Sequence, residues 1–217
     1  MTSANGQAGE TGTSRAISAI KQRILRGELL PGEQLGQERL AAEIGISRVP
    51  LREALLVLAD QGLLDRRSQR GFVVARRSRA EFAQLHFMLD VLEDELLRTI
   101  VWPGSETCDH LRELNRKMTE LVYASDWFEI VELNHAFHQS LWSLSTENLI
   151  VKEVERIWPL ADAYIVRTYS RAEYRREAVE CHEQILAAIE AQDNVVLRKV
   201  SAEHRRATFV GAEPTFL

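Results

Sequence analysis

Apolar residues recur every three or four positions through the first quarter of the chain, which is the period of amphipathic α-helices. The pattern predicts one helix that begins at Thr13 and stops at Gly27, and a second over residues 37–43. Gly45 suits the left-handed backbone that ends a helix and allows a tight turn. Ser47 is placed to be the N-cap of a third helix. One apolar stripe would pack that helix on the first two: Leu51, Ala54, Leu55 and Leu58.

Two short segments after the third helix have the pattern of β-strands. They cover residues 63–67 and 71–75, and the polar residues 68–70 between them form a turn. Two helices joined by a tight turn and followed by a basic hairpin are typical of a winged helix-turn-helix, a DNA-binding domain. The sequence predicts such a domain over residues 13–75.

The rest of the chain has only the helical pattern, so the expected fold is mainly α. Its apolar stripes, such as Leu85, Met88, Leu89, Leu92 and Leu96, imply an antiparallel bundle. Six helices are predicted, approximately over residues 80–101, 105–124, 126–145, 147–170, 173–191 and 193–210.

The predicted domains are joined and preceded by polar segments. Residues 1–12 are small and polar without periodicity, and we expect a disordered tail there. Residues 76–80 are the expected linker, and residues 81–217 the helical domain for effector binding and dimerisation. No apolar run approaches a membrane helix, and the start of the chain does not resemble a secretion signal. We therefore expect a cytoplasmic protein without membrane contact.

Charge is unevenly distributed along the chain. The net charge is −5, yet residues 13–79 carry thirteen Lys or Arg against seven Asp or Glu. Residues 80–217 carry fourteen against twenty-four. A basic N-terminal third favours a nucleic-acid contact confined to one domain. Solvated surface charge explains these counts equally well, so charge alone does not decide.

Two arginines stand at the N-terminal end of the predicted third helix, Arg48 and Arg52. In a helix-turn-helix this end approaches base edges in the major groove, and a guanidinium can bond two acceptors of guanine at once. Arg70, at the tip of the hairpin, could enter a minor groove or touch phosphate. The alternative for Arg48 is an ion pair with Glu43 or Glu53 on a solvated face.

The motif PGEQL…ERLAAEIGISRVPLREALLVLADQGLL…RGFVV closely resembles the winged helix-turn-helix of GntR-family transcription regulators, over residues 13–75. Two positions depart from the family pattern: Val49 stands where Thr is common, and Glu38 stands where many members carry Arg, with Arg39 adjacent. The DNA-contacting residues that the resemblance implies are Arg39, Ser47, Arg48, Val49, Arg52, Arg70 and Gly71.

Four residues of the helical half form a candidate metal site. Asn134 and His138 are four apart and share a helix face, while His182 and His204 lie on the last two helices. Three imidazoles and one oxygen could converge on a divalent metal. By spacing alone the signal is weak, because a lone His on an amphipathic helix is more often a surface or core residue.

The helical half resembles the FCD domain of the FadR subfamily, in its six-helix VanR-like group. The resemblance implies a divalent metal held by Asn134, His138, His182 and His204, with zinc expected and nickel or manganese as alternatives. Asn134 replaces the commoner Asp, which should weaken the affinity for the metal. The other three histidines are left out of the ligand set: His86, His110 and His135.

In such domains the metal keeps open positions for a small carboxylate effector, often assisted by an Arg in an RxxLE pattern. This chain has Leu89 in place of that Arg, so either the effector is not a simple carboxylate or another cation serves. The candidate effector-binding residues are Arg98, Arg156, Arg167 and Tyr164, and the alternative for each is a surface salt bridge.

The predicted function is a transcriptional regulator, a repressor rather than an enzyme. A homodimer would bind a palindromic double-stranded DNA operator, and an organic acid bound beside the metal would change that affinity. One alternative is a constitutive DNA binder with a structural metal. Another is a metal-dependent hydrolase, against which no general base accompanies the histidines in a recognisable motif.

Overall fold

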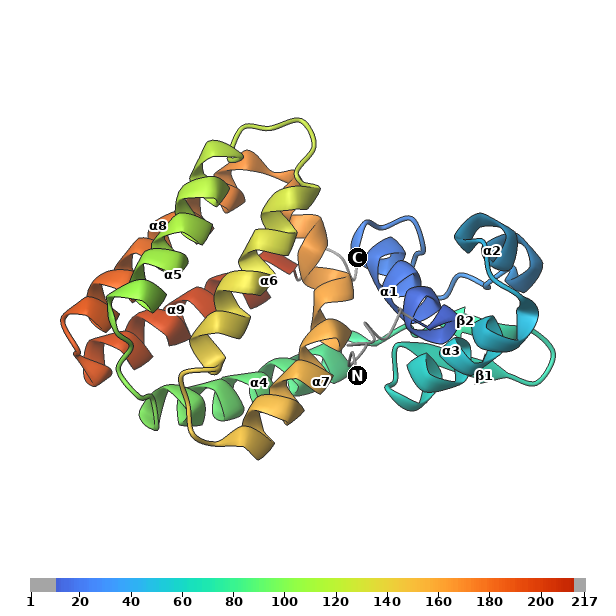
Figure 1. The fold of residues 1–217 in the computed structure, drawn as a ribbon, viewed down its shortest axis with the longest axis horizontal. Coiled ribbons are helices and arrows are strands. Elements are labelled where there is room, and N and C mark those ends of the chain that lie inside the picture. Colours follow the sequence, from blue (N-terminus) through green and yellow to red (C-terminus); the bar gives the residue numbers. More distant parts are fainter. Residues whose placement is uncertain (1–10, 213–217) are drawn as a thin grey trace, which may run out of the picture. The chain divides into compact units, whose positions relative to one another are not determined.

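The computed structural model describes residues 11–212, which divide between residues 76 and 77 into two compact units. The N-terminal unit holds three helices and a two-stranded sheet, and the second unit is all-helical (Figure 1). The predicted fold class, a winged helix-turn-helix followed by a helical bundle, is confirmed. Within the described residues, no helix is long and apolar enough to cross a membrane.

The N-terminal unit is built on helix α3. Its elements are α1 (Gly12–Leu25), α2 (Gln37–Ile44), α3 (Arg48–Asp60), β1 (Leu64–Arg67) and β2 (Gly71–Val74). Helix α3 packs on α1, α2 and β1. The predicted apolar stripe is the reason, because all four of its residues are buried: Leu51, Ala54, Leu55 and Leu58.

Helix α1 begins slightly earlier than the sequence predicted. Thr11 is its N-cap, and the side-chain oxygen of Thr11 accepts a hydrogen bond from the backbone N–H of Ser14 at 3.1 Å. The cap satisfies a donor that would otherwise be unpaired at the helix start. Most of the tail expected over residues 1–12 lies outside the described residues.

Strands β1 and β2 form an antiparallel hairpin in which Leu64 pairs with Val74 and Arg67 with Gly71. The backbone of Gly71 is left-handed, with φ of 68°, a conformation that glycine adopts without a Cβ penalty. Leu64 and the apolar residues of β2 pack inward. The arginines of β1 and the turn therefore remain on the surface.

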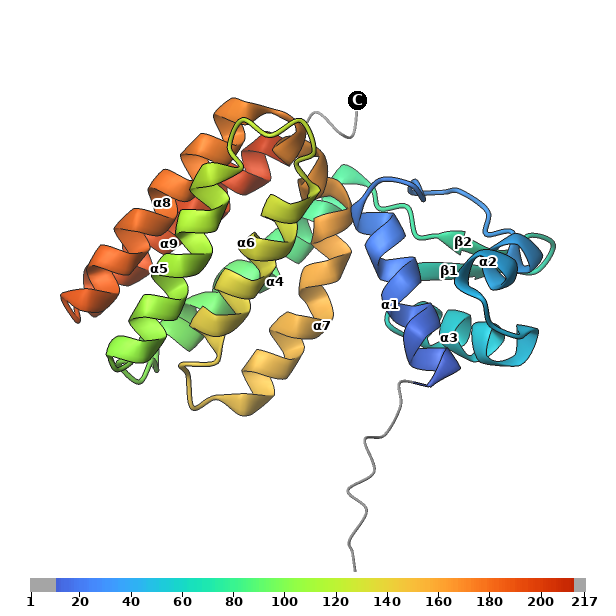
Figure 2. The ribbon, with the colours of Figure 1, turned by 45° about the horizontal axis from the view of Figure 1, so that its top comes forward.

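The second unit is an antiparallel bundle (Figure 2). Helix α5 packs between α6 and α8, while α4 packs against α7 and α9. A hydrophobic core lies between α5, α6 and α8 and includes Leu111, Phe137 and Ile185. The elements are α4 (Arg79–Arg98), α5 (Ser105–Glu120), α6 (Phe128–Trp142), α7 (Asn148–Ile165), the 3-10 helix η1 (Val166–Ser170), α8 (Ala172–Glu190) and α9 (Asn194–Ala212).

Helix α4 begins within the segment expected to be the linker. Ser78 and Glu81 form a capping box, in which each side chain accepts a hydrogen bond from the other residue's backbone N–H. This pattern of Ser followed three residues later by Glu starts the helix at Arg79. The prediction was wrong for one residue of the apolar stripe of α4, because Met88 is exposed to solvent.

We expect the bundle core to be sensitive to truncation at Leu111, which is fully buried. Leu111→Ala should lower the free energy of unfolding by roughly 2–5 kcal/mol, since it removes apolar contact and leaves a cavity. The control Leu149→Ala truncates an 81% exposed leucine and should stay within about 0.5 kcal/mol of wild type. All four tryptophans lie in the bundle, so urea unfolding followed by their fluorescence measures this unit. Equal losses for the two variants would contradict the assigned core.

Candidate functional site

The first candidate site is the exposed N-terminal end of α3. Gly45, with φ of 71°, ends α2 and turns the chain into α3. Leu51 and Leu55 are buried, so Arg48 and Arg52, one turn apart on the other side, face solvent. The helix N-terminus also carries the positive end of the helix dipole, which favours phosphate. This end of α3 can therefore present two guanidinium groups to DNA.

Ser47 and Val49 flank the first of these arginines. Ser47 occupies the N-cap position with extended backbone, but its side chain makes no capping hydrogen bond. The hydroxyl group of Ser47 therefore forms no hydrogen bond with the backbone N–H groups at the start of α3. Val49 is 69% exposed, an unusual position for a large apolar side chain, and it lies on the same end of α3.

Arg48 forms an ion pair, but not with either residue that the sequence suggested. Its Nη2 donates to Oε1 of Glu38 at 2.7 Å. Glu43 instead accepts a hydrogen bond from Arg23 of α1, and Glu53 accepts one from the first turn of the same helix. Glu38 comes from α2, so the pair joins the two helices of the motif at their exposed ends.

The hairpin supplies a second basic surface. Arg70 lies in the turn between β1 and β2 and is exposed, directly before Gly71. A groove of about 390 Å³ runs beside this turn. Its charged lining residues are three arginines and one aspartate: Arg67, Arg70, Arg76 and Asp65. The excess of guanidinium groups suits a polyanion.

The second candidate site is a cluster of three histidines inside the bundle. His138 comes from α6, His182 from α8 and His204 from α9, and one nitrogen of each lies within 4.8 Å of the others. All three side chains are buried. Neither nitrogen of His138 or of His182 has a hydrogen-bond partner among the described residues. The ring of His182 is fixed by stacking on Phe137, with ring centroids 4.1 Å apart.

These imidazoles are held in their neutral form. Burial lowers the pKa of His138 and of His182 well below the usual value, and neighbouring imidazoles add to the effect. Burial also lowers the pKa of His204 to about 4, with a further contribution from Arg205. A neutral imidazole has a free lone pair, which is the form that ligates a metal.

Asn134, the fourth residue of the predicted ligand set, lies on α6 with His138. It precedes His138 by one turn of α6, is buried, and its Oδ1 has no hydrogen-bond partner among the described residues. A buried amide oxygen without a partner costs free energy, as do the unpartnered imidazole nitrogens. A divalent cation could take one nitrogen from each of the three imidazoles, and an amide oxygen is also a suitable ligand, so the types of donor fit a metal.

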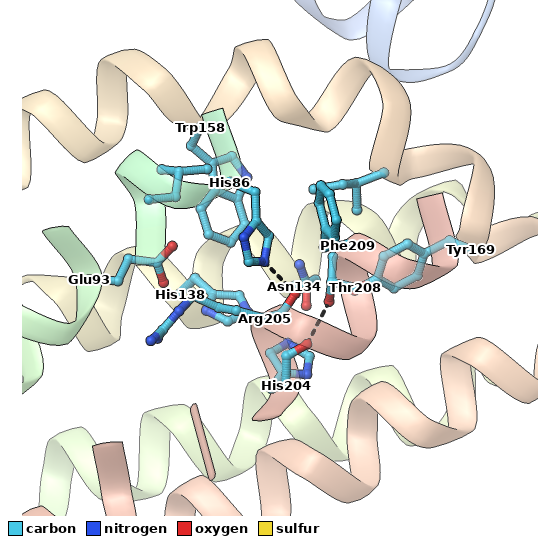
Figure 3. Close-up of a pocket in the computed structure, with 12 residues that line it drawn as sticks. His86, Glu93, Asn134, His138, Trp158, Tyr169, His204, Arg205, Thr208 and Phe209 are labelled. Atoms are coloured by element: carbon cyan, nitrogen blue, oxygen red, sulfur yellow. Dashed lines mark hydrogen bonds between the residues drawn. The ribbon is translucent and has the colours of Figure 1, made fainter. Parts of the chain in front are cut away.

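A cavity of about 40 Å³ adjoins the cluster (Figure 3). That volume holds only a few water-sized groups. Asn134, His138 and His204 form part of its wall, and aromatic and aliphatic side chains form another part. The apolar lining residues are Leu89, Trp158, Ile165, Tyr169 and Phe209. The cavity therefore joins possible metal ligands to an apolar wall.

The cavity also contains a buried charged group that the sequence reasoning did not select. Arg205 is 8% exposed and its Nε donates to Asp90 at 2.9 Å. Glu93 lines the same cavity and accepts a hydrogen bond from the indole N–H of Trp142 at 3.3 Å. Burial raises the pKa of Glu93 to about 7, although the guanidinium of Arg205 and this hydrogen bond oppose the rise.

The position of Arg205 could have been read from the helical period of α9. The inward residues of α9 recur at spacings of three and four: Leu197, Ser201, His204, Arg205 and Ala212. An arginine on that face, next to a candidate ligand, is the signal that was missed. His86 was also set aside, yet it lines the cavity, with Nε2 3.3 Å from the carbonyl oxygen of Arg205.

The four predicted effector-binding residues do not line the cavity. Arg98 pairs with Glu95 within α4, and Arg156 pairs with Glu153 within α7. These pairs lie three residues apart on exposed helix faces, where such contacts form readily.

The other two predicted residues are also placed elsewhere. Arg167 is exposed. Tyr164 is buried, and its hydroxyl accepts a hydrogen bond from the backbone N–H of Arg77 at 2.5 Å. The guanidinium group that does line this cavity is that of Arg205.

His135 belongs to a separate contact beside the cluster, in keeping with its omission from the ligand set. Its Nε2 forms an ion pair with the buried carboxylate of Asp162, and its ring meets that of Trp158 edge-on, with ring centroids 5.9 Å apart. Burial lowers the pKa of His135, but the carboxylate of Asp162 more than offsets this effect, so the pKa is raised.

Comparison with known proteins gives the same two parts. Residues 13–74 match the family described as bacterial regulatory proteins, gntR family, and residues 76–207 match the FCD domain. An HTH-type transcriptional regulator in an unstable DNA locus of Streptomyces ambofaciens is 30% identical over 213 residues, covering 93% of this chain and 85% of that protein.

Two proteins of Escherichia coli K12 are also similar. The HTH-type transcriptional regulator McbR is 26% identical over 197 residues, 88% of each chain. The HTH-type transcriptional repressor RspR is 23% identical over 188 residues, 84% of this chain and 82% of its own length. The solved structure of McbR superimposes with a TM-score of 0.82, over 95% of this chain and 99% of that one.

The fold, the exposed end of α3 and these matches define a DNA-binding transcriptional regulator and not an enzyme. Within that class, the chain belongs to the gntR family of bacterial regulatory proteins and carries an FCD domain after its winged helix-turn-helix.

The pKa of Glu93 predicts how stability changes with pH. The carboxyl ionises near 4.5 in the unfolded chain and near 7 in the folded one, so the folded state keeps a proton that the unfolded state loses. Glu93 should therefore cost stability as pH rises from about 4.5 to about 7. Glu93→Gln should exceed wild type by roughly 1–3 kcal/mol at pH 8 and match it at pH 4.

The measurement is urea unfolding followed by tryptophan fluorescence, with a chelator present so that bound metal does not contribute. Glu203→Gln changes an exposed glutamate of α9 and is the control, expected to keep the pH profile of wild type. A constant difference between Glu93→Gln and wild type at every pH would show that Glu93 is not held in its protonated form.

Proposed function

We propose that this regulator binds an operator through α3 and the hairpin, and that a small organic acid bound beside a divalent metal in the bundle changes its affinity for DNA. The observation that carries the proposal is the buried cluster of three histidines, one nitrogen of each within 4.8 Å of the others, next to a cavity lined by Arg205. A fold alone would gain nothing from burying so many unpartnered acceptors.

DNA binding is proposed to centre on Arg48 and Arg52 in the major groove, where each can donate to the O6 and N7 atoms of a guanine. The exposed methyl groups of Val49 suit the methyl group of a thymine. The remaining contacts, mainly to the phosphate backbone, are assigned to Arg39, Ser47, Arg70 and Gly71.

The metal is proposed to be held by His138, His182, His204 and Asn134. Three neutral nitrogens and one amide oxygen suit zinc, and nickel or manganese are alternatives. When bound, the metal supplies a Lewis acid that attracts a carboxylate. The protein itself positions the four donors on α6, α8 and α9 and excludes bulk water from them.

The effector is proposed to be a small acid with an apolar part. Leu89 makes one wall apolar at the position where many relatives carry an arginine, and Arg205 supplies a guanidinium from α9 instead. Because Arg205 already pairs with Asp90, a carboxylate entering the cavity would share this cation. The cavity's volume of about 40 Å³ favours a compact ligand.

Regulation follows from linkage between the two sites. A ligand that binds one conformation of the regulator better shifts the population toward that conformation and so changes the affinity for the operator. The operator then changes the affinity for the ligand by the same factor. We propose a cytoplasmic homodimer on a palindromic operator, acting as a repressor like RspR. The alternative is a constitutive DNA binder in which the metal is only structural, which the small volume of the cavity favours.

The assignment of α3 predicts the effect of Arg52→Ala. Loss of a bidentate contact should reduce discrimination at one base pair by roughly 1–3 kcal/mol while the fold survives. The operator is first obtained by selection from random DNA with the full chain, and affinities are then measured on single base-pair variants. Arg176→Ala, which removes an exposed arginine of the bundle, is the control. Base preferences unchanged by Arg52→Ala would refute the assignment.

The proposed ligand set predicts the effect of His182→Ala. Zinc at about a hundred times its Kd should stabilise the wild type by about 2.7 kcal/mol, and the variant should lose both bound metal and this gain. Elemental analysis of dialysed protein and thermal unfolding with added zinc measure the two effects. His110→Ala, at an exposed histidine, should behave as wild type. Full metal occupancy in His182→Ala would remove His182 from the set.

A further inference from the structure

We infer that Glu38 and Arg48 act as one reading unit, in which Glu38 determines how selectively the arginine reads a base. This inference rests on the proposed placement of α3 in the major groove. It concerns a residue that departs from the pattern of the family, since many members carry an arginine at the position of Glu38.

The ion pair has an unusual position for a surface contact. Glu38 lies in the first turn of α2 and Arg48 is the first residue of α3, so the pair joins two helix starts across the turn. The distance from Nη2 to Oε1 is 2.7 Å, and the side chains are 80% and 81% exposed. A pair so exposed adds little to the stability of a fold. Its location on the proposed DNA-binding face points to recognition.

The pair leaves Arg48 able to read a base. A guanidinium has five N–H donors, and the contact with Glu38 uses Nη2 alone, so enough donors remain for the two acceptors of guanine. The carboxylate also restricts the side chain before DNA arrives. Fewer rotamers are then lost on binding, which favours the oriented contact.

The carboxylate also opposes a non-specific use of the arginine. An unpaired guanidinium at a helix N-terminus would bind any phosphate, whatever the sequence. With Glu38 beside it, the local charge is balanced and the phosphate gains little. The pair should therefore bind DNA weakly when the correct base is absent and selectively when it is present.

The test is Glu38→Gln in the full chain, which keeps the side chain's shape and removes its charge. The base pair to examine is the one that Arg48→Ala no longer discriminates on the operator selected by wild type. Glu38→Gln should reduce discrimination at that base pair by about fivefold. It should also bind unrelated DNA more tightly, because Arg48 is then free to contact one more phosphate. The slope of log Kd against log salt concentration should therefore become steeper by about 0.9.

The matched control is Glu28→Gln, which removes the same charge from an exposed glutamate after α1 and should change neither quantity. An equal gain in affinity on every sequence, with discrimination intact, would mean that Glu38 only repels DNA. A lower melting temperature with discrimination intact would mean that Glu38 only stabilises the start of α2 through the helix dipole. Either result overturns the inference.

A separate outcome distinguishes this inference from the proposal on which it rests. If Arg48→Ala keeps every base preference of wild type, the placement of Arg48 in the groove is wrong and the reading unit falls with it. If Arg48→Ala relaxes one position and Glu38→Gln leaves it intact, only the role of Glu38 is wrong.

Discussion

The organisation of the bundle depends on one constraint: polar atoms that are buried must find partners. Three imidazoles and the amide of Asn134 lie in its interior, and most of their acceptor atoms have no partner among the described residues. Burial also keeps the imidazoles neutral, and neutral imidazoles are metal ligands. The same need explains the neighbouring contacts, since the buried Arg205 pairs with Asp90 and the indole of Trp142 donates to the buried Glu93. The proposed metal would complete this set.

The N-terminal unit meets the opposite requirement, because its polar groups must remain available. The stripe of α3 buries its apolar side against α1 and thereby holds Arg48 and Arg52 in solvent. Exposed arginines bind phosphate regardless of sequence unless something limits them. The contact between Arg48 and Glu38 is such a limit, formed by a residue of the preceding helix.

Much of this could be predicted from the sequence, because short-range patterns determine it. The periodicity of Leu51, Ala54, Leu55 and Leu58 and the glycine at position 45 were enough to predict the helix-turn-helix. The start of α4 differs by one residue from the prediction, because the capping box of Ser78 and Glu81 begins the helix at Arg79. Contacts between helices were harder. The pairing of Arg48 with Glu38 and of Arg205 with Asp90 depends on how helices pack, and sequence spacing does not determine that.

We propose that the site in the bundle and the DNA-binding surface are thermodynamically coupled. Linkage makes this testable, because a coupling between two ligands is reciprocal. The measurement uses zinc-loaded full chain and the organic acid that most raises its melting temperature. The Kd for the operator is measured with and without the acid, and the Kd for the acid with and without the operator. Coupling of the two sites should change both Kd values by the same factor, about fivefold or more. An acid that binds the protein and leaves the operator Kd unchanged would contradict it.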